Sequence, residues 1–123
     1  MSARVEIVDA KEADYSQIMH FFKESGHEVA FVSSWKKALK RFKREKPDIL
    51  FLAPGLPELG GVEAFTRIKK NGGCADIFAV VDSPEQGIEA MRHGSAYYFV
   101  RPCKLDEVKI VTARILAQRC YRQ

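Results

Sequence analysis

Residues 46–57 read Lys-Pro-Asp-Ile-Leu-Phe-Leu-Ala-Pro-Gly-Leu-Pro, and the apolar run 49–52 at their centre decides the fold class. A run in which every side chain is apolar is typical of a parallel strand covered by helices on both faces. Pro47 precedes the run and Pro54-Gly55 follow it, as residues that favour turns. Residues 49–52 therefore predict a central strand of an α/β domain.

Four further apolar runs, at residues 5–8, 29–32, 77–81 and 97–100, predict four more strands. Helical segments are expected between them, because apolar residues recur there at the i, i+3, i+4, i+7 spacing of a helix with one buried face. These stripes are Tyr15, Ile18, Met19 and Phe22; Trp35, Ala38, Leu39 and Phe42; Val62, Phe65 and Ile68; and Leu105, Val108, Thr112 and Ile115. The alternation predicts a (βα)5 α/β fold, with a doubly wound parallel five-stranded sheet in the flavodoxin-like order 2-1-3-4-5.

The length of 123 residues suits one domain spanning residues 1–123. No apolar run approaches the ~20 residues of a membrane span, and the first residues lack the apolar core of a signal peptide. We therefore expect a cytoplasmic protein without a membrane partner. The three histidines and three cysteines show no metal-ligand spacing, so no metal site is expected.

A basic segment carries much of the net charge of +4, through Lys36, Lys37, Lys40, Arg41, Lys43, Arg44 and Lys46. Such a helix can contact nucleic acid or acidic partners, whereas the alternative is a solvated helix face. We favour the solvated face because no helix-turn-helix pattern accompanies the charge. Direct binding of nucleic acid by this domain is accordingly not expected.

Function is sought where the strands end, because ligands of doubly wound sheets bind at the carboxyl ends of the strands. The residues that follow strands one, three, four and five are Asp9-Ala10, Ala53-Pro54-Gly55, Asp82 and Arg101-Pro102.

The chain resembles the receiver domains of bacterial response regulators along nearly its whole length. The resemblance is carried by residues 46–52, by Leu56-Pro57 and Gly61, by His93-Gly94-Ser95, and by Tyr98 three residues before Arg101. Receivers of this family carry an acidic pair after strand one and a phosphate-accepting Asp at the end of strand three. A Ser or Thr ends strand four, and Lys-Pro follows strand five. The resemblance implies a phosphorylation pocket at this edge of the sheet.

The pocket departs from the family pattern at most of these positions. Asp9 matches the first acidic residue, but Ala10 replaces the second and Ala53 stands at the acceptor position. A methyl group cannot be phosphorylated, and magnesium needs several oxygen ligands, so Mg²⁺ binding is expected to be weak or absent and no other cofactor is expected. Val81 aligns with the hydroxyl position, although Asp82 or Ser83 are alternatives there. Arg101 replaces the lysine, and we expect it to pair with Asp9 across the crevice.

The resemblance implies a two-component signalling module, and the departures predict one that works by protein-protein contact without aspartyl phosphorylation and is not an enzyme. The resemblance implies an interaction face formed by the fourth helix, fifth strand and fifth helix, which here includes Tyr98, Val100 and Arg92. Its partner would be another protein, a second copy in a homodimer, or an attached output domain, with regulation of transcription as one output. The last helical segment reaches Gln123 without a stop signal, as expected for the N-terminal part of a longer regulator.

Two alternatives belong to other functional classes. Phosphotransfer or phosphatase activity could use another carboxylate, such as Asp82 or Glu58, although the Asp-x-Asp of related phosphatases is missing after strand one. A nucleotide- or flavin-binding domain is disfavoured, because residues 10–13 lack a glycine-rich phosphate loop and no G-x-G-x-x-G pattern occurs.

Overall fold

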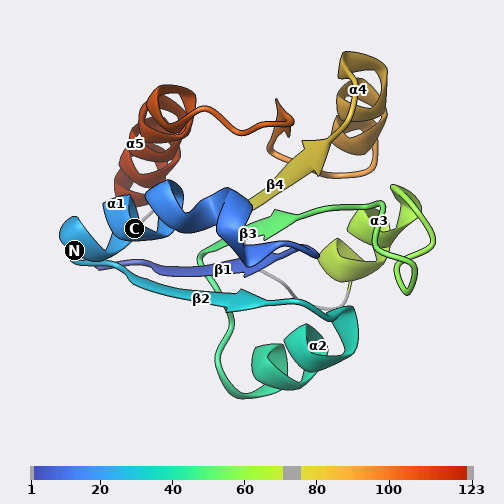
Figure 1. Cartoon of the computed structure of the whole chain (residues 1–123), viewed down its shortest axis with the longest axis horizontal. Coiled ribbons are helices and arrows are strands. Elements are labelled where there is room, and N and C mark those ends of the chain that lie inside the picture. The colour runs from blue at the N-terminus through green and yellow to red at the C-terminus, as the bar shows by residue number, and fades with distance from the viewer. Residues whose placement is uncertain (1, 71–75, 122–123) are drawn as a thin grey trace.

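Five parallel strands form one sheet in a computed structural model that describes residues 2–70 and 76–121 (Figure 1). The strands are β1 (Arg4–Val8), β2 (Glu28–Val32), β3 (Ile49–Leu52), β4 (Asp76–Val81) and β5 (Tyr97–Val100). The helices are η1 (Glu12–Tyr15), α1 (Ser16–Glu24), α2 (Trp35–Arg44), α3 (Glu63–Lys70), α4 (Pro84–Arg92) and α5 (Leu105–Tyr121). The sheet order β2-β1-β3-β4-β5 confirms the predicted α/β fold and topology.

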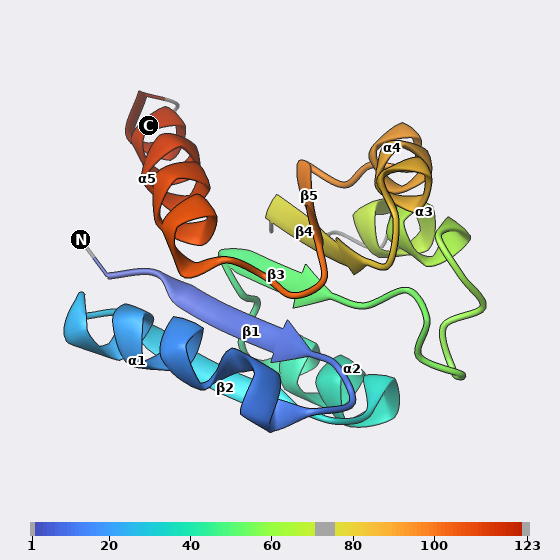
Figure 2. The ribbon, with the colours of Figure 1, turned by 45° about the horizontal axis from the view of Figure 1, so that its top comes forward.

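Helices cover both faces of the sheet, and each face has its own apolar core. Side chains of α1 and α5 pack on one face, and those of α2, α3 and α4 pack on the other. Figure 1 shows α1 and α5 above β1 and β2, with α2 below them, and Figure 2 shows the same sheet from a tilted view. Leu50 and Leu52 enter the α2–α4 core, whereas Ile49 and Phe51 enter the α1–α5 core, which explains why β3 is apolar at every position.

The starts of two helices show how the sequence sets the boundaries. The side chains of Ser34 and Ser83 accept hydrogen bonds from backbone amides in the first turns of α2 and α4. Pro84 occupies the first turn of α4, where its missing amide hydrogen costs nothing. The side chain of Gln86 accepts a further hydrogen bond from Asp82 N, at 2.9 Å, just before α4 begins. Among the described residues, no helix has the length and apolarity that a membrane crossing needs.

Candidate functional site

The carboxyl ends of β1, β3, β4 and β5 meet at one edge of the sheet. Val8 pairs with Leu52, and Val81 pairs with Val100, so the residues that follow these strands are neighbours. Ala53 N donates to Val8 O at 3.2 Å, and Arg101 N donates to Val81 O at 2.9 Å. The structure therefore places the strand-end residues in one crevice, namely Asp9, Ala10, Ala53, Val81 and Arg101.

Arg101 and Asp9 form the pair expected from the sequence, and the structure shows that it is bidentate. Nη1 of Arg101 donates to Oδ2 of Asp9 at 2.7 Å, and Nη2 donates to Oδ1 at 3.0 Å. The side chain of Asp9 is 4% exposed and that of Arg101 is 34% exposed. Asp82, which is mostly exposed, approaches Nε of the same guanidinium at 3.3 Å. The planar fork of arginine makes this arrangement possible, whereas a lysine would offer one ammonium.

Two further donors complete the coordination of Asp9. The buried hydroxyl of Tyr15 donates to Oδ2 at 2.5 Å, and Ala10 N donates to Oδ1 at 2.7 Å. Each carboxylate oxygen therefore accepts two hydrogen bonds. Sequence reasoning placed Tyr15 only in the apolar stripe of the first helical segment. The useful signal was its hydroxyl, because a buried tyrosine usually needs a hydrogen-bond partner.

The pKa values of the three side chains reflect this network. Burial acts to raise the pKa of Asp9, but the hydrogen bonds from Arg101, Tyr15 and Ala10 N outweigh it and hold the pKa below its ordinary value. Burial and the hydrogen bond to Asp9 raise the pKa of Tyr15. The hydrogen bond to Asp9 also raises the pKa of Arg101. At neutral pH the cluster therefore consists of a carboxylate, a neutral phenol and a guanidinium.

The remaining pocket positions contribute no polar side chain. Ala53 and Val81 are each 1% exposed and present only methyl groups, whereas Ala10 is exposed. A cavity of about 300 Å³ beside the pair is lined by Asp14, Tyr15, Arg101, Pro102 and Cys103. Burial raises the pKa of the Cys103 thiol to about 11, so this thiol is protonated at neutral pH and is a poor nucleophile. Within the described ranges, no three His, Cys, Asp or Glu side chains are grouped closely enough to hold a metal ion.

The residues expected at the interaction face lie on β5 and α4. Tyr98 is half-buried, and its ring lies against Gly87 of α4, where an added Cβ would overlap the ring. Val100 is half-buried against the α2–α4 core, and Arg92 is exposed and contacts Glu89 at 3.2 Å. Gly87 was not singled out from the sequence. A glycine within a helix is the signal that could have found it, because such a residue often allows a close contact.

The cations of the basic segment are exposed, and one of them also pairs with a buried carboxylate. Arg41 of α2 donates through Nε to Oε1 of Glu6 at 2.6 Å, and Glu6 is 1% exposed in β1. The basic segment thus lies on an exposed helix face, as expected, and Arg41 additionally pairs with Glu6. Glu6 lies within an otherwise apolar run, and a buried carboxylate needs a hydrogen-bonding partner, so the sequence did contain a signal for this pair.

Comparison with known proteins agrees with this architecture. The response regulator receiver domain family matches residues 5–113. The alkaline phosphatase synthesis transcriptional regulatory protein PhoP of Bacillus subtilis is 25% identical over 118 residues, which cover 94% of this chain and 49% of PhoP. The luminescence regulatory protein LuxO of Vibrio campbellii is 26% identical over 87 residues, which cover 69% of this chain and 19% of LuxO. The chain thus spans less than half the length of either relative.

A solved structure shows the same fold. The receiver domain of the Francisella response regulator 1452 superposes with a TM-score of 0.82 at 22% identity, covering 95% of this chain and 98% of that domain. Since the family match covers most of the chain, the protein belongs to the response regulator receiver domain family.

Proposed function

We propose that this receiver controls an output domain by protein-protein contact, without aspartyl phosphorylation and without an enzymatic activity of its own. The observation that carries the proposal is the fully hydrogen-bonded carboxylate of Asp9. Its two oxygens accept four hydrogen bonds from Arg101, Tyr15 and Ala10 N. These donors occupy the atoms with which a receiver would hold a divalent cation. The crevice is thus a structural ion-pair site in place of a phosphorylation site.

Magnesium does not fit the side chains at this edge of the sheet. It prefers an octahedral shell of oxygen atoms and is usually held by carboxylates. Asp9 is the one buried carboxylate among the described residues of the crevice, and its partner Arg101 brings a positive charge to the same place. A bound Mg²⁺ would have to break the bidentate pair and then lie beside an unpaired guanidinium. Such an exchange is unfavourable.

The two positions that match the phosphate acceptor and the hydroxyl of the family, Ala53 and Val81, offer neither group. Ala53 follows β3 and Val81 ends β4, and both side chains are buried hydrocarbon. A covalent input at Ala53 therefore has no chemical basis. The ring of Tyr98 packs against Gly87 of α4, so Tyr98 already has a packed position without a phosphoryl group.

The surface of α4 and β5 is the contact site that we assign to the partner. Ile88 and Met91 lie three residues apart in α4 and are 51% and 44% exposed, next to exposed Arg92. Apolar side chains beside an arginine are typical of protein contacts. The partner is an attached output domain, another protein or a second copy. Regulation of transcription is the output suggested by the description of PhoP, of which this chain matches about half.

Acetyl phosphate tests the proposal. The protein is incubated with acetyl phosphate and magnesium, and its intact mass is then measured, beside a receiver with a complete acidic pocket as a positive control. We expect no added phosphoryl group on this chain under conditions in which the control is modified. A stoichiometric gain of one phosphoryl mass would overturn the proposal.

Two variants identify the residue if a phosphoryl group is found. Asp82 is 75% exposed and Glu58 is also exposed, and these are the carboxylates that the alternative phosphotransfer activity would use. Loss of the mass gain in Asp82→Asn or in Glu58→Gln would assign the modified residue and would support that alternative over our proposal.

A further inference from the structure

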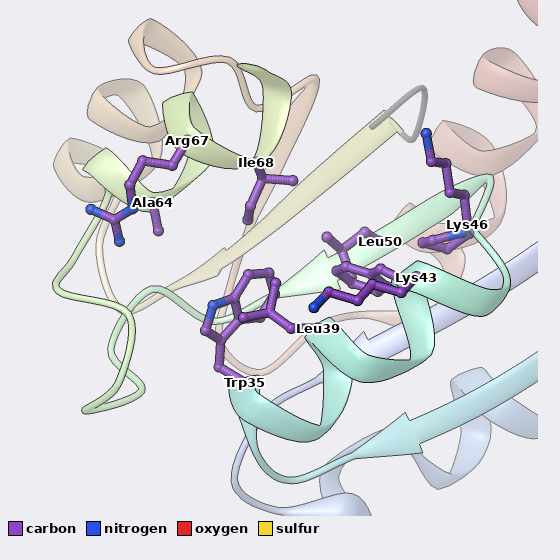
Figure 3. Close-up of a pocket in the computed structure, with 10 residues that line it drawn as sticks. Trp35, Leu39, Lys43, Lys46, Leu50, Ala64, Arg67 and Ile68 are labelled. Atoms are coloured by element: carbon purple, nitrogen blue, oxygen red, sulfur yellow. The ribbon is translucent and has the colours of Figure 1, made fainter. Parts of the chain in front are cut away.

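A groove of about 440 Å³ lies between α2 and α3, above β3 (Figure 3). Leu50 of β3 forms its floor. Trp35 and Leu39 of α2 face Ala64 and Ile68 of α3 across this floor. The groove therefore lies over the α2–α4 face of the sheet and is lined by different residues from the Asp9–Arg101 crevice.

The wall on the α2 side is apolar and preformed. Trp35 and Phe42 pack edge to face, with their ring centroids 5.6 Å apart and an angle of 73° between the rings. Leu39 lies between them in the sequence and is 43% exposed, although it lines the groove. Apolar surface in a concave site is the usual source of binding energy for small ligands.

The polar side chains around this apolar surface are all cationic. Lys43, Lys46 and Arg67 line the groove, and its described lining contains no Asp or Glu. Figure 3 shows the Lys43 side chain extending from α2 along the groove towards Leu39. Arg67 belongs to α3, and its Nη2 donates a 2.7 Å hydrogen bond to Leu59 O. This bond holds the guanidinium in place. An occupant that complements these walls is apolar in its body and negative at one end.

We propose that the α2–α3 groove binds a small amphipathic anion, with one carboxylate on an aliphatic or aromatic body. Its apolar part would lie between Leu39 and Ile68 above Leu50, and its carboxylate would contact Lys43. The volume of about 440 Å³ is within the range of roughly 300–1,000 Å³ that is usual for small-molecule sites. This binding does not depend on the absence of phosphorylation, so either proposal can fail alone.

Octanoate is the probe for a first titration, with 1-octanol as the matched ligand that has the same body and no charge. Trp35 is the one tryptophan in the chain, so its fluorescence reports on the groove alone. We expect octanoate to shift the emission saturably and to perturb backbone amides of α2 and α3 in a ¹H–¹⁵N correlation spectrum. We expect 1-octanol to bind at least about fivefold more weakly, because it lacks the contact with the lysine.

Two variants with matched controls locate the site. Lys43→Ala should raise the Kd of octanoate about fivefold, whereas Lys40→Ala, on the same helix but outside the groove, should leave it unchanged. Leu39→Glu should raise the Kd more than about tenfold, because it places a negative charge on the apolar wall. Ile110→Glu, at a position 61% exposed on α5, is the control for a general effect of this change.

Three results would overturn the proposal. The first is an emission change that does not saturate, and the second is equal affinity for octanoate and 1-octanol. The third is a change of oligomeric state in Leu39→Glu but not in Ile110→Glu, measured by analytical ultracentrifugation. That outcome would show that a second copy of the chain covers the groove.

Discussion

Arg101 and Asp9 are 92 positions apart in the sequence and are joined by two hydrogen bonds, of 2.7 and 3.0 Å. Asp9 follows β1 and Arg101 follows β5, and the sheet places β3 and β4 between these two strands. The pair therefore spans the carboxyl edge of the sheet and ties its centre to the β5 edge. Tyr15 supports the pair from η1 by donating to the same carboxylate.

Arg101→Ala should destabilise the protein by about 1–3 kcal/mol. The change leaves Asp9 buried with fewer donors, and breaking one partner of a buried pair is costly, although the 34% exposure of Arg101 reduces the effect. Urea denaturation followed by circular dichroism measures the difference. A change within about 0.5 kcal/mol, as for an ordinary surface substitution, would show that the pair is not a structural tie.

Arg101→Lys is the matched control, because it keeps the charge and loses the bidentate geometry. We expect a stability between that of the wild type and that of Arg101→Ala. A lysine variant as stable as the wild type would show that the charge alone is sufficient.

The stability that Asp9 contributes should depend on pH in the acid range. Burial acts to raise its pKa, but hydrogen bonds from Arg101, Tyr15 and Ala10 N lower it below the ordinary 3.8. The contribution is therefore complete above pH 3.8, the ordinary pKa of an aspartate, and is lost as the pH falls through the lower pKa of Asp9 in the folded state. Denaturation of the wild type and of Asp9→Asn from about pH 6 to about pH 2 should show a difference that shrinks on acidification. A constant difference would contradict this.

The stability that Glu6 contributes should depend on pH with the opposite sign to that of Asp9. Its burial in β1 raises the pKa above the ordinary 4.5, and the hydrogen bond and charge of Arg41 only partly offset this. The folded state then binds the proton more tightly, so its stability falls as the pH rises from 4.5 through the raised value. Glu6→Gln, which keeps an oxygen for Arg41, should be relatively more stable at pH 7 than at pH 4. Denaturation at both values checks this, and greater relative stability of the variant at pH 4 would contradict it.

Gly87→Ala should destabilise the protein by about 1–3 kcal/mol, because the new methyl group would overlap the Tyr98 ring. Helix propensity alone predicts a gain of about 0.5–1 kcal/mol for the same change, so the sign of the effect is informative. Chemical denaturation measures both Gly87→Ala and its combination with Tyr98→Ala. In the Tyr98→Ala background the added methyl should be neutral or stabilising, and a stabilising effect in the wild type would exclude the close packing.

The fold could be predicted because local patterns determine it. Apolar runs and helical spacing identify the strands and most of the helices, and Ser83-Pro84, at the start of α4, is a pattern typical of a helix start. The pairing of Asp9 with Arg101 was also predictable, because the order of the strands brings the residues after β1 and β5 to one edge. Opposite charges at that edge made the pair the natural expectation.

Contacts between elements that share no sequence pattern were harder to predict. Tyr15 and Gly87 each sit in a helix, and their roles depend on which residue the fold places opposite them. Arg41 was hidden among other cations, and only the position of Glu6 on the α2 side of β1 distinguishes it. Such contacts depend on side-chain packing in three dimensions, whereas periodicity reports only which face of an element is buried.

Titration with Mg²⁺ tests whether Arg101 takes the place of a metal ion in this receiver. The backbone amides of Asp9, Ala10 and Ala53 are followed in ¹H–¹⁵N correlation spectra while Mg²⁺ is raised into the millimolar range. We expect no saturable shift of these amides, because the guanidinium already occupies both oxygens of Asp9. Saturable shifts confined to these residues, together with loss of the Arg101–Asp9 contact, would contradict it.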